Sequence, residues 1–220
     1  MTELLYQLLD TPKAPLIIQQ ALVILNNENE KRRAFYEWLD DDMKAEFING
    51  EVVVHSPELD RHTEAVMNFC MLLNVFVTKH DLGLVRMEKA LVELTRNSYE
   101  PDVCFWGSSK AAAIQPDQLY YPAPDLVVEV LSKSTQKHDR ETKFIDYAAH
   151  GVAEYWLVDP LRQQIEAFTI DADTDEYEAA GTYTLKQAIE SKAVQGFAMP
   201  VRAVFDKAAN MIALQQLMSA

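Results

Sequence analysis

Two acidic residues stand inside runs of strong β-formers, where a carboxylate calls for a specific partner. Glu129 lies in the middle of PDLVVEVL (residues 124–131), and Asp102 opens DVCFW (residues 102–106) directly after a proline. Side chains alternate between the two faces of a strand, so each acid shares a strand face with apolar neighbours. Two strands would therefore each contribute one carboxylate to a common site.

Paired carboxylates of this kind suit a divalent cation. Mg²⁺, or Mn²⁺ in its place, prefers hard oxygen ligands and commonly takes one or two carboxylates together with water and substrate phosphate. A nearby lysine can orient the attacking water and stabilise the charge that develops at phosphorus. Lys143 lies on the helix expected after Glu129, and Asp139, four residues earlier, would project from the same helix face. The residues predict a phosphodiesterase site with Asp102 and Glu129 as metal ligands and Lys143 as the catalytic lysine.

Structural explanations compete with this prediction. An acid in a strand often lies at a solvated sheet edge or pairs with a surface base, which would account for Asp102 and Glu129 separately. Lys143 could equally pair with Asp139 on an exposed helix. Only the combination of Asp, Glu and Lys in the order strand, strand, helix favours catalysis over these explanations.

The elements that must position these residues follow from turn signals and periodicity. Asn49-Gly50 between two alternating runs predicts a hairpin with strands at 45–48 and 51–55. Apolar residues at spacings of three and four predict a long amphipathic helix within 58–80. Strands interrupted by helices give an α/β (α+β) fold around a mixed sheet. Further strands are expected at 84–95, 102–106, 125–131, 154–160, 164–170 and 176–184, and helices at 31–42, 137–151 and 205–218.

Length and charge limit the class of protein. With 220 residues and 49% hydrophobic content, the chain can form one ordinary core, predicted at 31–220 after an N-terminal extension at 1–30. It has no 18-residue apolar run and no secretory signal, so we expect a cytoplasmic location and no membrane contact. The net charge of −14 argues against passive wrapping of nucleic acid by a basic surface. A local cleft or a bound cation can still reverse the potential where DNA approaches.

The sequence also resembles the Uma family of restriction endonucleases, within the PD-(D/E)XK nuclease superfamily. The likeness begins near residue 32, reaches the C-terminus and is most specific at 124–160; its motifs are GEVVVHSP, His62, PDV, PDLVVEVLS, Asp139, Lys143, Tyr147 and GVAEYWLVDP. It implies a restriction-endonuclease-like mixed β-sheet core flanked by helices, and a Mg²⁺-dependent endonuclease that hydrolyses DNA. By this resemblance, Asp102 is the motif aspartate and Glu129 is the acid of the (D/E)XK element, both metal ligands.

One position departs from the superfamily pattern. Lysine is expected two residues after the acid, on the same strand face, and Leu131 stands there. A lysine from the following helix could restore the charge at the same point in space, and the family's recurring lysine corresponds to Lys143. Lys133, on the same strand face if the strand continues, is the alternative.

Three further residues are candidates for supporting roles, in addition to Asp139. The resemblance makes His62 a candidate for the site, although a lone histidine at a helix start is more often a cap or a surface residue. Glu46 could approach the metal from the hairpin, or could be a solvated strand end. Ser132 could hydrogen-bond a carboxylate or phosphate, or could simply begin a turn.

The alternative function is a catalytically inactive nuclease-fold module that binds protein or nucleic acid, favoured by Leu131 and by the acidic charge. DNA is the expected partner, and a homodimer is a further candidate assembly. Because a DNA backbone must approach the acids, we also expect basic side chains such as Lys133, Lys137 and Arg140 to border the carboxylate cleft.

Overall fold

The computed structural model describes most of the chain, namely residues 2–40, 43–171 and 173–219. The chain forms two compact units. The N-terminal unit consists of residues 1–55 and 95–99, and the main unit consists of residues 56–94 and 100–220. The main unit therefore carries every residue predicted for the site except Glu46.

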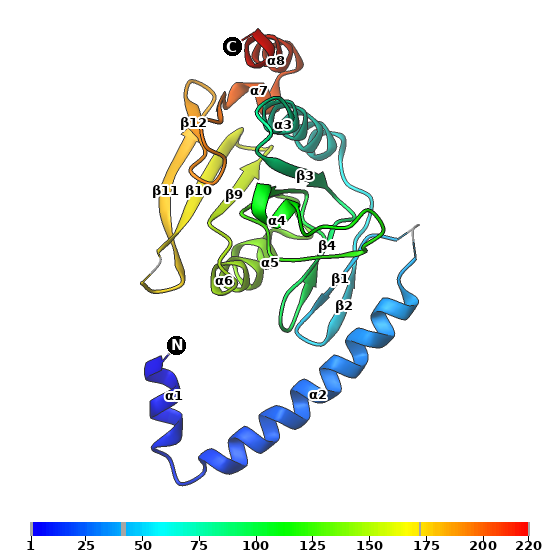
Figure 1. Cartoon of the computed structure of the whole chain (residues 1–220), viewed down its shortest axis with the longest axis vertical. Helices are drawn as coiled ribbons and strands as arrows, with labels where there is room; N and C mark the ends of the chain where they lie inside the picture. Colours follow the sequence, from blue (N-terminus) through cyan, green and yellow to red (C-terminus); the bar gives the residue numbers. More distant parts are fainter. Residues whose placement is uncertain (1, 41–42, 172, 220) are drawn as a thin grey trace. The chain divides into compact units, whose positions relative to one another are not determined.

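The N-terminal unit combines two helices with a small antiparallel sheet (Figure 1). Its hairpin turns at Asn49 (φ 51°) and Gly50 (φ 84°), and a two-residue type I′ turn requires positive φ at both positions. The rings of Phe35 and Phe47 have centroids 5.8 Å apart, so the end of the long helix packs on the hairpin. The elements are α1 (Thr2–Leu9), α2 (Ala14–Trp38), β1 (Ala45–Ile48), β2 (Glu51–Val54) and β5 (Ser98–Tyr99).

The helix predicted at 31–42 is the last part of a longer helix. α2 begins at Ala14 and ends at Trp38, and residues 41 and 42 lie outside the described residues. Pro15 suits the first turn because it has no backbone N–H that would lack a partner there. Only Ala14 and Phe35 of α2 are buried, and most of the helix is exposed. The helix therefore has no continuous buried stripe whose apolar spacing would have predicted its full length.

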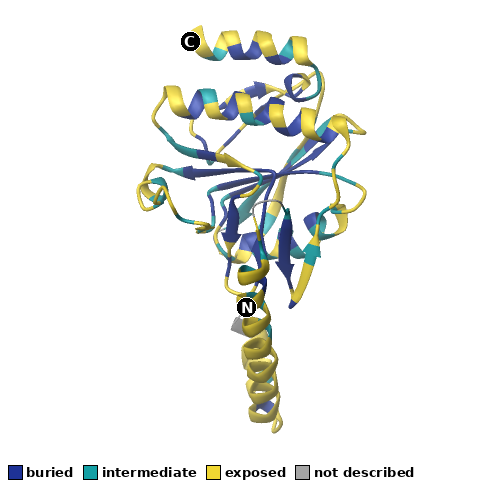
Figure 2. Cartoon of the chain, turned by 90° about the vertical axis from the view of Figure 1, so that its right-hand side faces the viewer, coloured by how far each residue is buried: buried dark blue, intermediate teal, exposed yellow. Residues whose placement is uncertain are grey.

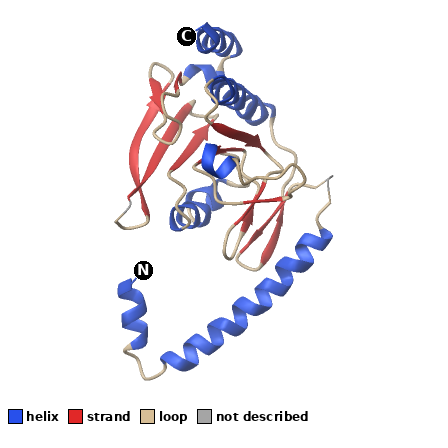
Figure 3. Cartoon of the chain, in the orientation of Figure 1, coloured by secondary structure: helices blue, strands red, loops and turns tan. Residues whose placement is uncertain are grey.

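A six-stranded mixed sheet forms the centre of the main unit, with helices around it (Figure 3). Its strand order is β11-β10-β9-β8-β6-β3. β8 and β9 run parallel and their neighbours run antiparallel. Helices between β8 and β9 supply the crossover that a parallel pair needs. This mixed sheet flanked by helices confirms the predicted fold class. Its strands are β3 (Gly83–Met87), β6 (Val103–Gly107), β8 (Leu126–Val130), β9 (Glu154–Asp159), β10 (Gln164–Asp171) and β11 (Glu176–Thr184).

Alternation along the strands sorts the side chains of this sheet onto two faces. Val103, Val128 and Trp156 belong to the main hydrophobic cluster, together with the buried side of α3 (Asp60–Lys79). Phe69 of α3 meets Trp156 edge to face, with ring centroids 5.7 Å apart. The amphipathic helix predicted within 58–80 thus covers one face of the sheet and leaves the other for the polar residues.

The single strand predicted at 84–95 is interrupted. Glu88 and Lys89 have φ values of 41° and 39°, and this left-handed backbone separates β3 from β4 (Leu91–Glu93). Glutamate and lysine rarely adopt such angles, so their identities gave no turn signal. β4 pairs in parallel with β7 (Tyr120–Tyr121) and not with the six-stranded sheet.

The helix predicted at 137–151 is divided in two at Glu141, whose backbone departs from helical geometry (φ −116°, ψ −79°). The C-terminal helix expected at 205–218 is preceded by a short separate helix. None of the described helices is both long and apolar enough to cross a membrane. The remaining elements are α4 (Ser108–Ala111), α5 (Gln136–Arg140), α6 (Thr142–Ala149), α7 (Arg202–Phe205), α8 (Lys207–Ser219), β12 (Ala188–Glu190) and β13 (Ala198–Pro200).

Candidate active site

Asp102, immediately before β6, lies at the position opposite Glu129 of the neighbouring antiparallel strand β8. The register of β6 and β8 pairs Val103 with Val128, so the next pair along is Asp102 with Glu129. Directly opposed residues of an antiparallel pair place their side chains on the same face. This face is the one away from α3, because Val103 and Val128 lie in the cluster beneath α3. The structure thus brings together the two acids that the sequence predicted as metal ligands.

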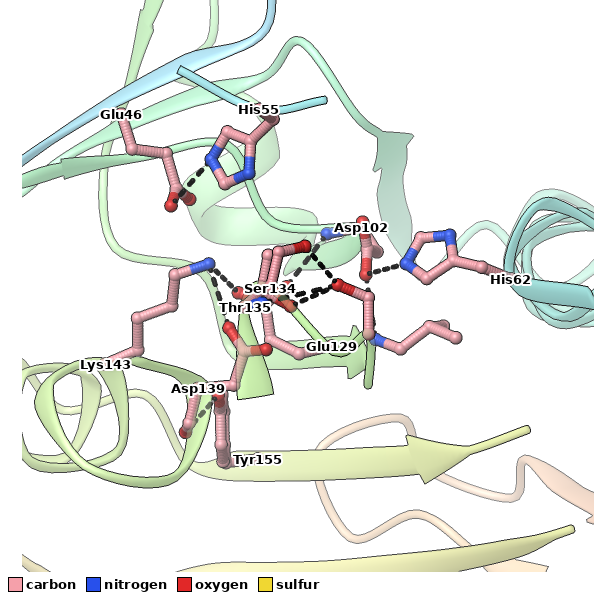
Figure 4. A network of polar contacts seen from close by, with 12 residues as sticks. Glu46, His55, His62, Asp102, Glu129, Ser134, Thr135, Asp139, Lys143 and Tyr155 are labelled. Atoms are coloured by element: carbon pink, nitrogen blue, oxygen red, sulfur yellow. Dashed lines mark hydrogen bonds and ion pairs between the residues drawn. The ribbon is translucent and has the colours of Figure 1, made fainter. Parts of the chain in front are cut away.

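Two backbone hydrogen bonds hold the acids in this arrangement (Figure 4). The N–H of Asp102 donates to Glu129 Oε2 at 3.3 Å, and the N–H of Val130 donates to Asp102 Oδ2 at 2.8 Å. Asp102 is only 5% exposed and Glu129 only 3%. Carboxylates at this depth need such donors, because removing an ionised group from water without partners is costly. The explanation that they lie at a solvated sheet edge does not hold.

Lys143 reaches Glu129 from the helical segment that follows β8. Its Nζ lies 3.0 Å from Glu129 Oε1 and 3.2 Å from Asp139 Oδ1, and the lysine is buried. Asp139 belongs to α5 and Lys143 to α6, and the two side chains still meet across the break at Glu141. The ammonium therefore lies where a lysine supplied by the helix was expected. Lys133, the alternative, is exposed and lines a neighbouring cleft.

Two buried tyrosines hold this helical segment against the sheet. The hydroxyl of Tyr155 on β9 donates to the backbone carbonyl of Asp139 at 2.9 Å, and the ring of Tyr147 lies 5.6 Å from that of Tyr155. Burial raises the pKa of Tyr155 well above its ordinary value, and the charges of Glu129 and Asp139 raise it further. Tyr155 therefore stays protonated, and its hydroxyl positions Asp139 by donating a hydrogen bond to the backbone carbonyl of that residue.

His62 connects the acids to the cleft. It lies in the first turn of α3, is buried, and places Nε2 3.3 Å from Asp102 Oδ2. It also contributes to the lining of the cleft. His62 is thus neither a surface residue nor a simple cap, and the structure groups it with Asp102.

The cleft next to His62 has a volume of about 980 Å³ and belongs entirely to the main unit. Lys133 and Arg140 line it, whereas Lys137 is not among its lining residues. The acids Asp102 and Glu129 do not line it either, so the expectation that these basic side chains border the carboxylates stays a prediction. Arg140 donates two hydrogen bonds to Glu166, at 2.9 and 2.6 Å. The basic residues that line the cleft, apart from His62, are Arg61, Lys133, Arg140 and Arg162, and the acidic ones are Glu58, Asp159 and Glu166.

Arg61 and Arg162 were not singled out from the sequence. Arg61 precedes His62 at the start of α3, and Arg162 lies in the turn between β9 and β10. Both are far along the chain from the basic cluster at 133–143, and only the tertiary fold brings the three regions to one cleft. Adjacency to the candidate His62 was the one local signal that could have identified Arg61.

Ser132 and Glu46 have local partners. The Oγ of Ser132 lies 2.9 Å from the Oγ of Ser134 and accepts the N–H of Thr135 at 3.3 Å, which is a turn role, while Ser132 also lines the cleft. Glu46 is buried in the N-terminal unit, with Oε2 3.1 Å from His55 Nε2. A solvated strand end is therefore wrong for Glu46, and its approach to a metal stays a prediction.

The carboxylates of Asp102 and Glu129 fit a divalent cation that takes few ligands from the protein. In the part of the chain that the structure describes, no cluster of three or more His, Cys, Asp or Glu side chains is arranged to hold a metal ion. Mg²⁺ rarely needs such a cage, since one or two carboxylates with waters and substrate phosphate complete its shell. Each carboxylate oxygen has two lone pairs, so the hydrogen bonds to Asp102 and Glu129 do not exhaust their capacity as ligands.

Comparison with known proteins agrees with this fold. Residues 32–202 match the sequence model of the Uma2 family, described as "Putative restriction endonuclease". Among solved structures, the chain is similar to "a putative nuclease belonging to DUF820" from Anabaena variabilis, with a TM-score of 0.67 at 15% identity. The similarity covers 80% of this chain and 96% of that chain. No curated protein matches the chain. The nuclease-like core predicted from the sequence is thereby confirmed.

Proposed function

The chain belongs to the Uma2 family, and we propose that it is an endonuclease that hydrolyses phosphodiester bonds of DNA with the help of a divalent cation. One observation carries the proposal. Asp102 and Glu129 face each other on neighbouring strands, and the Nζ of Lys143 lies 3.0 Å from Glu129. Two hard oxygen ligands beside a fixed positive charge are what hydrolysis at a phosphate requires.

Asp102 and Glu129 would hold Mg²⁺ or Mn²⁺, which when bound neutralises charge on the phosphate and lowers the pKa of water. The backbone N–H groups of Asp102 and Val130 fix the two carboxylates before substrate arrives, at 3.3 and 2.8 Å. Such preorganisation matters because ligand side chains that must be reordered during the reaction raise its barrier.

Lys143 would act on the phosphate through its charge. A lysine held between Glu129 and Asp139 is suited to electrostatic stabilisation of the transferring phosphate rather than to proton abstraction. Asp139 is then a positioning residue, because it holds the second side of the ammonium and is itself held by Tyr155. The lysine missing at position 131 is replaced in function by one that enters from α6.

The cleft beside His62 would receive the DNA backbone. Arg61, Lys133 and Arg162 supply positive charge there, within a molecule whose net charge is −14. Phosphate contacts by basic side chains provide most of the sequence-independent affinity of DNA-binding proteins. His62 lines the cleft and also contacts Asp102, so DNA bound in the cleft would approach the acids beside His62.

The alternative, an inactive nuclease-fold module that binds protein or nucleic acid, is favoured by burial. Asp102, Glu129 and Lys143 are buried, and among the described residues that line the cleft none of the three appears. Catalysis therefore requires that DNA or metal binding open a path from the cleft to the acids. A binding module would have no such requirement.

Cleavage of supercoiled plasmid with Mn²⁺ or Mg²⁺, compared with the same reaction in EDTA, tests the proposal. The wild-type protein should nick or linearise the plasmid only with the metal, and calorimetry should detect Mn²⁺ binding. Glu129→Gln should lose both signals. Plasmid binding in a gel-shift assay without cleavage and without metal binding would instead establish the inactive module.

A further inference from the structure

The N-terminal helices expose an unusual amount of apolar surface. On α1, Leu4, Tyr6 and Leu9 are 73%, 63% and 50% exposed. Figure 2 draws these helices in the colour of exposed residues over most of their length. The region that matches the nuclease family begins only at residue 32, so this surface lies outside the family's shared domain. Single exposed apolar residues are ordinary, but a contiguous set marks an interaction surface.

The first half of α2 carries its apolar residues as a broad stripe. Consecutive members of the set Ile17, Ile18, Leu22, Ile24 and Leu25 are one, two or four positions apart, and all five share one side of the helix. They are 36–55% exposed. A stripe of this width normally faces a protein core. Here it faces solvent, and the opposite side carries four amides, Gln19, Gln20, Asn26 and Asn27, together with the exposed Leu16 and Val23.

The second half of α2 is already occupied by its own unit. Arg96 donates two hydrogen bonds to Glu28, at 2.8 and 2.9 Å, and the hydroxyl of Tyr36 lies 2.7 Å from the Oγ of Ser98. Phe35 is buried against Phe47. The helix is therefore anchored from Glu28 onward, and the stripe before it projects with its apolar side unpacked.

We propose that two copies of this chain associate through residues 4–25, with α1 and the first half of α2 from each copy forming a four-helix bundle. A second copy brings the same stripe, and a two-fold axis pairs identical surfaces with each other. Four short helices packed around such apolar stripes make a standard bundle core.

The apolar area is sufficient for a dimer. Without Leu16 and Val23, which lie opposite the stripe, nine large apolar side chains between Leu4 and Leu25 are 36–73% exposed. At on the order of 100 Å² for each fully exposed aliphatic side chain, half-exposed residues offer roughly 500 Å² of apolar surface per copy. A stable interface buries about 800 Å² per partner, of which about 65% is apolar in homodimers. The two estimates agree.

Charge favours a second copy over a lipid surface. Residues 4–25 contain one acidic residue, Asp10, and one basic residue, Lys13, within a chain of net charge −14. Helices that lie on membranes carry lysine and arginine on their polar side. The side of α2 opposite this stripe has amides and two apolar residues but no basic residue, so it offers no charge to an anionic headgroup and none that repels an identical helix.

Sedimentation velocity of the full chain tests the proposal, with the monomer mass of 25.0 kDa as reference. The wild-type protein should sediment as a dimer at about 20 µM, and Ile18→Glu with Leu22→Glu should weaken dimerisation at least about 100-fold and give the monomer. Gln19→Glu with Gln20→Glu adds the same charge to the other side of the same helix and should leave the dimer intact.

Three outcomes would overturn the proposal: a monomeric wild-type protein at this concentration, a dimer that survives the Ile18→Glu/Leu22→Glu change, or equal dissociation of both double variants. Flotation of the wild-type protein with phosphatidylcholine–phosphatidylglycerol vesicles would also overturn it, in favour of a lipid surface. Circular dichroism of each variant confirms that the fold is retained, since the substituted side chains are exposed. Sedimentation does not depend on plasmid cleavage, so the proposed dimer and the proposed nuclease activity are tested independently.

Discussion

Asp102 and Glu129 are linked by two reciprocal hydrogen bonds from the backbone. The N–H of Asp102 donates to Glu129 Oε2 at 3.3 Å, and the N–H of Val130, the residue after Glu129, donates to Asp102 Oδ2 at 2.8 Å. The position of each acid thus depends on the strand that carries the other. A change in either side chain should disturb the metal site more than it disturbs the sheet, whose core lies on the opposite face.

Asp102→Asn and Glu129→Gln should each abolish metal binding and cleavage. The amides keep the shape of the acids but remove the charge that a divalent cation requires, so the cleavage rate should fall by about 10²-fold or more. Calorimetric Mn²⁺ titration and plasmid cleavage measure the two effects. Asp125→Asn is the control, because Asp125 pairs with Lys110 at 2.7 Å, away from the site, and should leave both signals intact.

Replacing Lys143 should cost both activity and stability. Lys143→Met would leave Glu129 and Asp139 buried without the cation between them, and removing one partner of a buried ion pair costs about 3–5 kcal/mol. Urea unfolding measures the loss, and plasmid cleavage should disappear. Lys133→Met removes an exposed lysine, so its free energy of unfolding should change by less than about 0.5 kcal/mol.

A second variant separates the structural role of Lys143 from its catalytic one. Lys143→Met combined with Asp139→Asn removes one of the two buried carboxylate charges that lose their cation. The double variant should therefore recover part of the lost stability without recovering cleavage. Full cleavage by Lys143→Met would show that Lys143 has no catalytic role and would favour Lys133 as the catalytic lysine.

The two acids could be predicted because their signals are local. Strand alternation placed Asp102 and Glu129 on defined faces, and the register of β6 and β8 then set them opposite each other. The hairpin at Asn49-Gly50 was equally local, since the turn type depends on those two residues. The meeting of Lys143 with Glu129 required a helix to cross back over its strand, and both the four-residue spacing of Asp139 and Lys143 and the family resemblance suggested it.

Features that depend on tertiary packing could not be predicted. Glu88 and Lys89 adopt left-handed angles that their residue types disfavour, so the strand at 84–95 looked continuous. The contact between His55 Nε2 and Glu46 Oε2 joins the residue after β2 to the neighbouring strand β1. Arg61 and Arg162 reach one cleft from distant parts of the chain.

The basic cleft predicts a specific dependence of DNA binding on salt. Arg162→Ala should weaken binding to any DNA sequence and reduce the slope of log affinity against log salt by about 0.9, the value for one lost phosphate contact. Arg202→Ala is a matched control: both arginines are more than 60% exposed and pair with a nearby aspartate, but Arg202 lies on α7, away from the cleft. Fluorescence anisotropy at several salt concentrations measures both slopes. Equal slopes for the two variants would exclude the cleft as the DNA site.

The ion pair between Arg140 and Glu166 at this cleft predicts a pH-dependent contribution to stability. Hydrogen bonds from Arg140 hold the pKa of the Glu166 carboxyl below its ordinary value. A carboxyl whose pKa is lower in the folded state stabilises the protein above its unfolded pKa, about 4.3 for glutamate, and this contribution disappears as the pH falls through the folded pKa.

Wild-type protein should therefore be more stable than Glu166→Gln at pH 7, by less than about 1 kcal/mol because the pair is partly solvated. The difference should shrink as the pH falls from about 4.3 through the lower pKa of the folded state, below which both proteins carry a neutral group at this position. Urea unfolding of both proteins across this range measures the difference and cancels the acid effects that they share. Glu176→Gln, at an exposed position on β11, is the control for removing one carboxylate from the surface. A stability difference between wild type and Glu166→Gln that stayed constant or grew with acidification would show that Arg140 does not hold Glu166 in its ionised form.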